Sequence, residues 1–98
     1  MTSAGTTEAR QRAARARQAS ILAQFVDGKS AQTASSRIRD LATLLVHCYP
    51  KPLLSIDEDD VEDFAARLDR LGELGAERRA RCIRTCRAFV KFAAPWRE

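Results

Sequence analysis

Side chains that commonly carry catalysis are scarce in this 98-residue sequence. It contains one histidine and one tyrosine, so enzyme classes that depend on histidine are hard to build from it. The four glycines form no motif that would cradle a phosphate. Large apolar side chains suffice for one compact core but are too few to enclose a large cofactor. We therefore expect one small domain that holds no cofactor.

Cysteine and long apolar runs are also scarce. The three cysteines are an odd number, and the N-terminus lacks the apolar stretch of a signal peptide, which argues against a disulfide framework. No apolar run approaches the roughly 20 residues that span a bilayer. We expect a soluble, cytoplasmic chain.

Histidine and cysteine could in principle combine into a zinc site. Cys82 and Cys86 are four residues apart on an expected helix, and His47 with Cys48 would complete a set of four ligands. All three cysteines, however, fall on apolar helix faces, where cysteine behaves as a small hydrophobic residue. We therefore predict no metal site.

Apolar residues recur at helical spacing in four segments, and no strand pattern is longer than residues 51–56. The first segment starts near Ile21 and ends at Gly28, a residue type that suits the position after a helix. The second has Ser30 as its N-cap and ends before Pro50. The predicted apolar face of the second segment consists of Ile38, Leu41, Leu44, Leu45 and Cys48.

The third segment has the clearest start. Asp57 as N-cap would place Asp60 at the third helical position and would pair Ile56 with Val61 across the helix start. The acidic side chains of this turn favour the positive end of the helix dipole, so helix initiation explains them without a metal. Its predicted apolar face consists of Val61, Phe64, Ala65, Leu68 and Leu71, and Gly72 ends it.

The fourth segment begins after Gly75 and ends at Pro95. Its predicted apolar face consists of Cys82, Ile83, Cys86, Phe89, Val90 and Ala93. The four segments together predict an all-α, compact bundle of about four helices over residues 19–98.

Residues 1–18 differ from this bundle in composition. They contain four arginines and one glutamate, and no large apolar residue follows Met1. The segment has high helix propensity but nothing to bury. We interpret it as a flexible basic arm that extends the next helix when bound. Its arginines suit phosphate contact, although a solvated tail is the simpler explanation of the composition.

Charge is distributed unevenly along the chain, whose formal net charge is +4. Residues 51–77 carry three basic and nine acidic side chains, whereas residues 78–98 carry seven basic and one acidic. Such a basic block indicates a surface for a polyanion. The alternative is that the acidic and basic helices simply pair with each other.

Basic side chains of the fourth segment fall away from its apolar face. Arg81, Arg84 and Lys91 lie on the opposite side, Arg87 lies at the flank and Arg78 lies near the start. Like charges on one helix repel one another, and a phosphate backbone would supply the counter-charge. The alternative is a solvated helix face.

Three short motifs follow one another along these segments. The second segment carries Ser30, Thr33, Arg37, Leu41 and Leu44, the third starts with IDEDDVEDF from Ile56 to Phe64, and the fourth contains IRTCRAFVKF from Ile83 to Phe92. In order and separation they resemble the N-terminal core-binding, SAM-like domain of tyrosine recombinases, the family of the phage integrases. The chain departs from the family pattern at Arg37, Leu44 and Gly75-Ala76, where tyrosine, phenylalanine and Leu-Ser are usual.

The resemblance implies a helical domain that clamps one side of duplex DNA through its second and fourth helices. The DNA-binding residues implied by position are Thr33, Ser35, Ser36, Arg37 and Arg39 on the second helix, and Arg78, Arg81, Arg84, Arg87 and Lys91 on the fourth. In that family a separate C-terminal domain carries the tyrosine nucleophile. Tyr49 lies beside two prolines without neighbouring arginine or histidine, so we expect that this chain alone is not an enzyme.

Three hypotheses of function follow. The first is the DNA-binding module of a site-specific recombinase or integrase, which binds double-stranded DNA alongside a catalytic domain or other recombinase protomers. The second is a helical protein–protein interaction domain. The third is a small helix-turn-helix regulator, with Glu73-Leu74-Gly75 as the turn between the last two helices.

Overall fold

The computed structural model describes residues 2–97 as four α-helices and two short 3₁₀ helices. The α-helices are α1 (Thr2–Val26), α2 (Ala31–Cys48), α3 (Glu58–Leu71) and α4 (Ala76–Ala93), and the 3₁₀ helices are η1 (Leu53–Ser55) and η2 (Ala94–Trp96). Within residues 2–97 there is no strand. The predicted all-α fold of about four helices is therefore confirmed.

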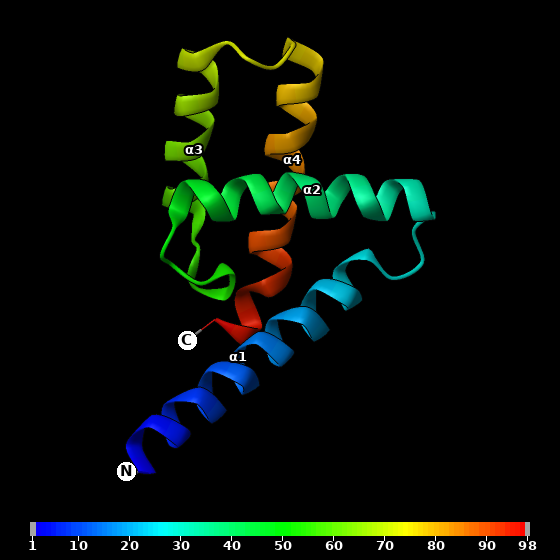
Figure 1. Cartoon of the computed structure of the whole chain (residues 1–98). Coiled ribbons are helices and arrows are strands. Elements are labelled where there is room, and N and C mark those ends of the chain that lie inside the picture. Colours follow the sequence, from blue (N-terminus) through cyan, green and yellow to red (C-terminus); the bar gives the residue numbers. More distant parts are fainter. Residues whose placement is uncertain (1, 98) are drawn as a thin grey trace.

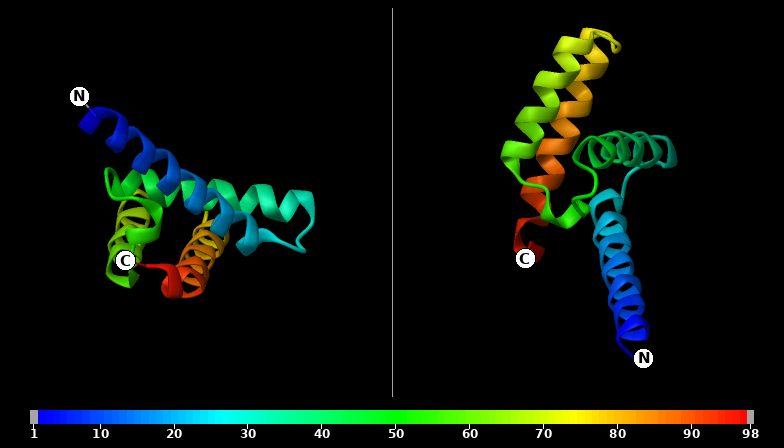
Figure 2. Two further views of the ribbon diagram at one scale, coloured as in Figure 1. Left: turned by 90° about the horizontal axis from the view of Figure 1, so that it is seen from below. Right: turned by 60° about the vertical axis from the view of Figure 1, so that its left-hand side comes forward.

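Two of the helices, α3 and α4, lie side by side and run antiparallel, and α2 crosses this pair (Figure 1). Figure 2 shows that α1 passes below α2, and that its N-terminal part projects away from the other helices. The radius of gyration is 14.8 Å, larger than the roughly 13 Å expected for a compact chain of this length. The projecting part of α1 accounts for the difference.

The helix ends follow the local signals in the sequence. Ser30 caps α2, because its Oγ accepts a hydrogen bond from the Thr33 amide (3.2 Å). Asp57 and Asp60 form a reciprocal capping box at the start of α3, with each carboxylate accepting from the other residue's amide at 3.0 Å. Gly72 ends α3 in the left-handed conformation, with φ of 63°. These predicted boundaries are confirmed.

All four helices and η1 contribute to one core. Its most buried large side chains include Leu41 and Leu44 from α2, Phe64 from α3 and Phe89 from α4. Phe25 joins α1 to this core, because its ring packs edge-on against Phe89 with 5.2 Å between the ring centroids. The core therefore holds α2 and α4 against each other, and this contact positions the candidate site described below.

Two predicted core residues lie at the surface instead. Ile38 of α2 is 45% exposed and Leu71 of α3 is 49% exposed, whereas Asp40 of α2 is only 6% exposed. The buried face of α2 is turned about the helix axis, away from Ile38 and toward Asp40. At the end of α3, Leu74 from the following loop packs against the core. Both predictions were wrong because hydrophobic spacing gives only the approximate direction of an apolar helix face. A residue at the edge of that face can be exposed while its neighbour is buried.

The first helix begins earlier than predicted. The prediction placed its start near Ile21, whereas α1 runs continuously from Thr2, so residues 2–18 belong to it. Alanine, arginine and glutamine favour the helix there, and the side chains from Thr6 to Arg17 are exposed. At the junction with the bundle, Arg17 Nη2 donates to the Trp96 carbonyl (2.9 Å) and Gln18 Oε1 accepts from the Leu53 amide (3.2 Å). The mobility of the arm stays a prediction.

The lengths and apolar content of the helices can be compared with those of membrane-spanning helices. Among residues 2–97, no helix combines the length and apolar character needed to cross a bilayer.

Candidate nucleic-acid interface

The first part of the candidate interface is the N-terminal half of α2. The cap at Ser30 satisfies the Thr33 amide, while the amides of Ala31 and Gln32 have no acceptor within the helix, as at any helix start. Exposed Thr33 and Ser35 and half-buried Ser36 add hydroxyl groups to the same turns. Such a helix start combines hydrogen-bond donors with the positive end of the helix dipole, which suits a phosphate.

A hollow of about 640 Å³ lies between this half of α2 and the exposed side of α4. Its lining consists of Gln32, Thr33, Ser35, Ser36, Arg37, Arg39, Asp40, Arg81 and Thr85. Every one of these side chains is polar or charged. Pockets for small organic molecules are lined mostly by apolar and aromatic groups, so this hollow is better suited to a polar, negatively charged partner.

A second hollow of about 490 Å³ continues along α4. Its lining consists of Arg37, Arg81, Arg84, Thr85, Arg87 and Ala88, so the two hollows share Arg37, Arg81 and Thr85. We call the lining of the two hollows together the basic groove. It brings together eight of the ten residues predicted to bind DNA, and the other two, Arg78 and Lys91, line neither hollow.

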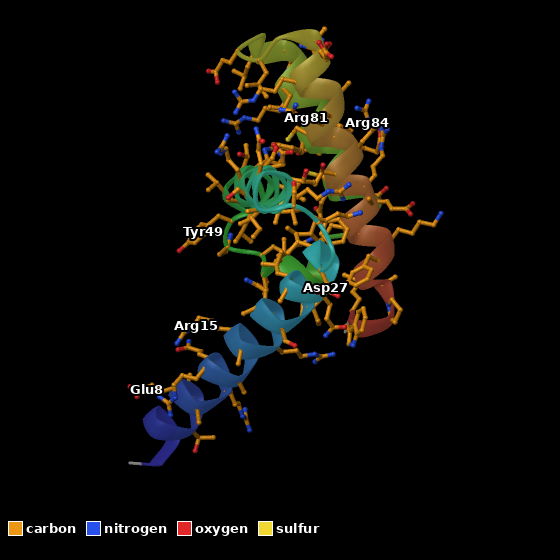
Figure 3. The ribbon with its side chains drawn as sticks, turned by 90° about the vertical axis from the view of Figure 1, so that its right-hand side faces the viewer. Glu8, Arg15, Asp27, Tyr49, Arg81 and Arg84 are labelled. Carbon is orange, nitrogen blue, oxygen red and sulfur yellow. The ribbon has the colours of Figure 1, made fainter. Side chains whose placement is uncertain are left out.

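Three arginines supply the unpaired positive charge of the basic groove. Arg39, Arg81 and Arg84 are exposed, and none of them forms an ion pair within residues 2–97. Glu77 precedes Arg81 by one helical turn, yet the two side chains do not pair in the structure. In Figure 3, Arg81 and Arg84 project from the upper part of α4, well away from Glu8 and Arg15 on the arm. These guanidinium groups are therefore available to an external anion.

The other two arginines of the groove have partners in the protein. Arg87 donates from Nη2 (2.7 Å) and Nε (3.1 Å) to Glu62 Oε1 of α3. The Arg37 guanidinium lies over the Phe25 ring, 5.4 Å from its centroid, which is a cation–π contact. The alternative prediction, that the acidic and basic helices pair with each other, is therefore correct for Arg87 and for Arg79, whose Nη2 lies 3.8 Å from Asp69 Oδ1 of α3. It does not extend to Arg81 or Arg84.

Sequence reasoning did not identify Asp40 as part of this site. Its side chain lines the larger hollow, and its Oδ2 is buried with no hydrogen-bond partner. Leaving a buried polar group unsatisfied costs about 1–3 kcal/mol, and more for a charged one. The available signal was its position directly before Leu41, beside the buried face of α2. Thr85 was also missed, although it lies one position before Cys86 on the buried face of α4.

The cysteines contribute to the core rather than to the groove surface. Cys82 and Cys86 are buried, and Cys48 is half-buried. A hydrogen bond to Cys82 and burial raise the pKa of the Cys86 thiol well above its ordinary value, so this group stays protonated and unreactive. Among residues 2–97, no three histidine, cysteine or acidic side chains cluster in a way that could hold a metal ion.

Tyr49 lies apart from the groove. It is 81% exposed, and Figure 3 shows it on the side of α2 that faces away from Arg81 and Arg84. A tyrosine nucleophile that attacks phosphate needs positive groups beside it to stabilise the developing charge. No such group pairs with Tyr49 within the described residues.

The helix-turn-helix hypothesis requires two helices that cross at roughly 90–120°. Here α3 and α4 run antiparallel and side by side (Figures 1 and 2), joined by residues 72–75. This is the geometry of a helical hairpin, so the structure does not favour that hypothesis.

Comparison with known proteins adds no assignment to this geometry. No protein-family model, no curated protein and no solved structure matches the chain. The basic groove is therefore the feature that indicates a function.

Proposed function

We propose that this chain is a double-stranded DNA-binding module, of the kind that tyrosine recombinases use as their core-binding domain. The observation that carries the proposal is the basic groove. In it, the hydroxyl-rich start of α2 and the unpaired guanidinium groups of Arg39, Arg81 and Arg84 face one continuous depression.

Each part of the groove has a role in this proposal. The hydroxyls of Thr33 and Ser35 and the amides at the start of α2 hold one phosphate group of the backbone. Arg81 and Arg84 lie one turn apart on α4. They contact phosphates of the same DNA strand or reach base edges. Binding releases counterions from the DNA, so the affinity depends steeply on salt.

The proposal assigns binding and positioning to this chain, with no bond-breaking step. In the recombinase family that the sequence motifs resemble, a separate catalytic domain closes on the opposite side of the duplex. A catalytic domain or further recombinase protomers are therefore the proposed protein partners, and double-stranded DNA is the proposed ligand.

The test is fluorescence anisotropy of the chain with a labelled random-sequence duplex over a range of salt concentrations. We expect Arg81→Ala and Arg84→Ala each to weaken binding and to lower the slope of log affinity against log salt by about 1. Arg70→Ala is the matched control, because Arg70 is an exposed arginine of α3 outside the groove. The groove variants should unfold at the same temperature as the control, since Arg81 and Arg84 are exposed and unpaired.

Two outcomes would contradict the proposal. One is that the groove variants bind DNA as tightly as Arg70→Ala does. The other is that the losses of binding in both groove variants match equal losses of thermal stability, which would trace the effect to folding rather than to contact.

A second candidate function, a protein-interaction domain, is favoured by one feature of α2. Ile38 and Val46 of α2 and Tyr49, the C-cap residue that follows it, are 45%, 76% and 81% exposed, and their spacing places them along one side of the helix. If the duplex is not bound even at low salt, while an acidic or apolar peptide surface is, this second function replaces the first.

A further inference from the structure

The basic groove contains one acidic side chain, and its position is unexpected for a surface that binds phosphate alone. Asp40 is 6% exposed and lines the larger hollow together with Arg37, Arg39 and Arg81. Its Oδ2 atom receives no hydrogen bond, and the carboxylate forms no ion pair with any described residue. The Cys82 thiol forms a hydrogen bond with this carboxylate, and the buried Oδ2 keeps an acceptor position that is open to a donor from outside the chain.

The charge of the surroundings restricts what that donor can be. A phosphate oxygen would be repelled by Asp40, although Arg39 and Arg81 around it attract phosphates. The partner must therefore present negative charge to the arginines and an N–H group to the carboxylate. DNA has both, because phosphates flank the major groove and some base edges in that groove carry amino groups.

The four base edges differ in how they would meet a carboxylate. Guanine and thymine offer acceptors in the major groove, which repel Asp40, and adenine places its acceptor N7 beside its amino group. Cytosine offers the N4 amino group without a neighbouring acceptor. Among the four bases, cytosine is the one that fits an isolated carboxylate best.

We propose that Asp40 recognises the N4 amino group of a cytosine in the major groove, and that Arg81 binds O6 and N7 of the paired guanine. The inference rests on the proposed DNA-binding function and deepens it, because it makes the groove a reader of one C·G base pair. Arg81 is suited to this role because it lines the same hollow and its guanidinium has no ion-pair partner among residues 2–97. Exposed Arg39, which lines the same hollow, is assigned to the backbone phosphates beside this base pair.

The first stage of the test selects bound duplexes from a random-sequence library with three proteins: the unmodified chain, Asp40→Asn and Asp27→Asn. The asparagine variant keeps the size of the side chain but adds an N–H donor to it. Asp27→Asn is the matched control, because it removes the same charge from an exposed site outside the groove. We expect the unmodified chain and the control to enrich C·G at one position, and Asp40→Asn to lose about tenfold of that preference.

The second stage replaces the selected cytosine by 2-pyrimidinone, a base that lacks only the amino group. Anisotropy should show a loss of about tenfold for the unmodified chain and for Asp27→Asn, and no loss for Asp40→Asn. This stage uses the unmodified chain, so it remains decisive if Asp40→Asn proves unstable.

Failure of this inference and failure of the proposed function give different results. If the unmodified chain binds duplexes with the expected salt slope but shows no C·G preference, the role of Asp40 is overturned and the groove stands. The same holds if removal of the amino group weakens the unmodified chain and Asp40→Asn equally. If the chain binds no duplex at low salt, the proposed function is overturned and this inference with it.

Discussion

Removal of the Asp57 side chain provides a direct test of how α3 is formed. Asp57 Oδ1 accepts a hydrogen bond from the Asp60 amide at 3.0 Å, and Asp60 Oδ2 accepts from the Asp57 amide at 3.0 Å. Asp57→Ala abolishes the first of these bonds and leaves the Asp60 amide without its acceptor. It also removes one negative charge from the positive end of the helix dipole.

The expected magnitude follows from these contacts. Replacement of an aspartate N-cap by alanine costs about 1 kcal/mol of the free energy of unfolding, within a range of about 0.5–2 kcal/mol. Both carboxylates are half-buried, so the hydrogen bonds are only partly replaced by water. For a chain of this length, a loss of about 1 kcal/mol lowers the melting temperature by about 4–8 °C.

Thermal and urea unfolding followed by far-ultraviolet circular dichroism measure this change. The matched control is Asp59→Ala, which removes the same charge from an exposed side chain of the same turn that forms no described cap contact. Its effect reports the dipole contribution alone, about 0.3–1 kcal/mol. If Asp57→Ala and Asp59→Ala lower the free energy of unfolding equally, the capping box does not stabilise α3 and the reasoning is refuted.

Three further outcomes are expected. Hydrogen bonds from the Lys51 side chain and the Asp57 amide hold the pKa of Asp60 below its ordinary value. The ionised Asp60 carboxylate therefore contributes to stability in full above about pH 4, and this contribution is lost as the pH falls through the lowered pKa. Acid titration of the unfolding free energy should show this loss, and Asp60→Asn should weaken the dependence. Leu44→Ala removes a fully buried side chain and should lower the free energy of unfolding in urea by about 2–5 kcal/mol. Ile38→Ala should change the same free energy by about 0.5 kcal/mol or less. Equal losses would contradict the orientation of α2 that buries Leu44 and exposes Ile38. Gly72→Ala forces an alanine to φ of 63° and should lower stability by about 1–2 kcal/mol in calorimetry, and an unchanged melting temperature would argue against the left-handed cap.

Element boundaries were predictable because they depend on interactions between residues close in sequence. The cap at Ser30, the reciprocal contact of Asp57 with Asp60 and the left-handed cap at Gly72 each join residues that are three or four positions apart. The apolar face of α4 was predictable for a related reason, because its residues repeat at helical spacing over the whole helix. The N-terminal extent of α1 was missed, since its helix propensity has no apolar pattern to reveal it.

The candidate site was predictable only in part. The resemblance to the recombinase core-binding domain, carried over by position onto α2 and α4, implied eight residues that line the basic groove. It did not separate Arg87, which pairs with Glu62 of α3, from Arg81 and Arg84, which have no such partner. Partners from other helices decide which charges stay available, and helical spacing contains no information about those partners.

The sequence by itself determined that this chain forms four helices with one basic and one acidic segment, since helix propensity, capping and charge are properties of neighbouring residues. Only the tertiary structure decided how far α2 turns about its axis where it crosses α4. That rotation exposes Ile38, buries Asp40 and brings the start of α2 to the arginines of α4. The physical reason is that packing optimises the contact of whole helix surfaces, so a carboxylate next to Leu41 becomes buried together with its apolar neighbours.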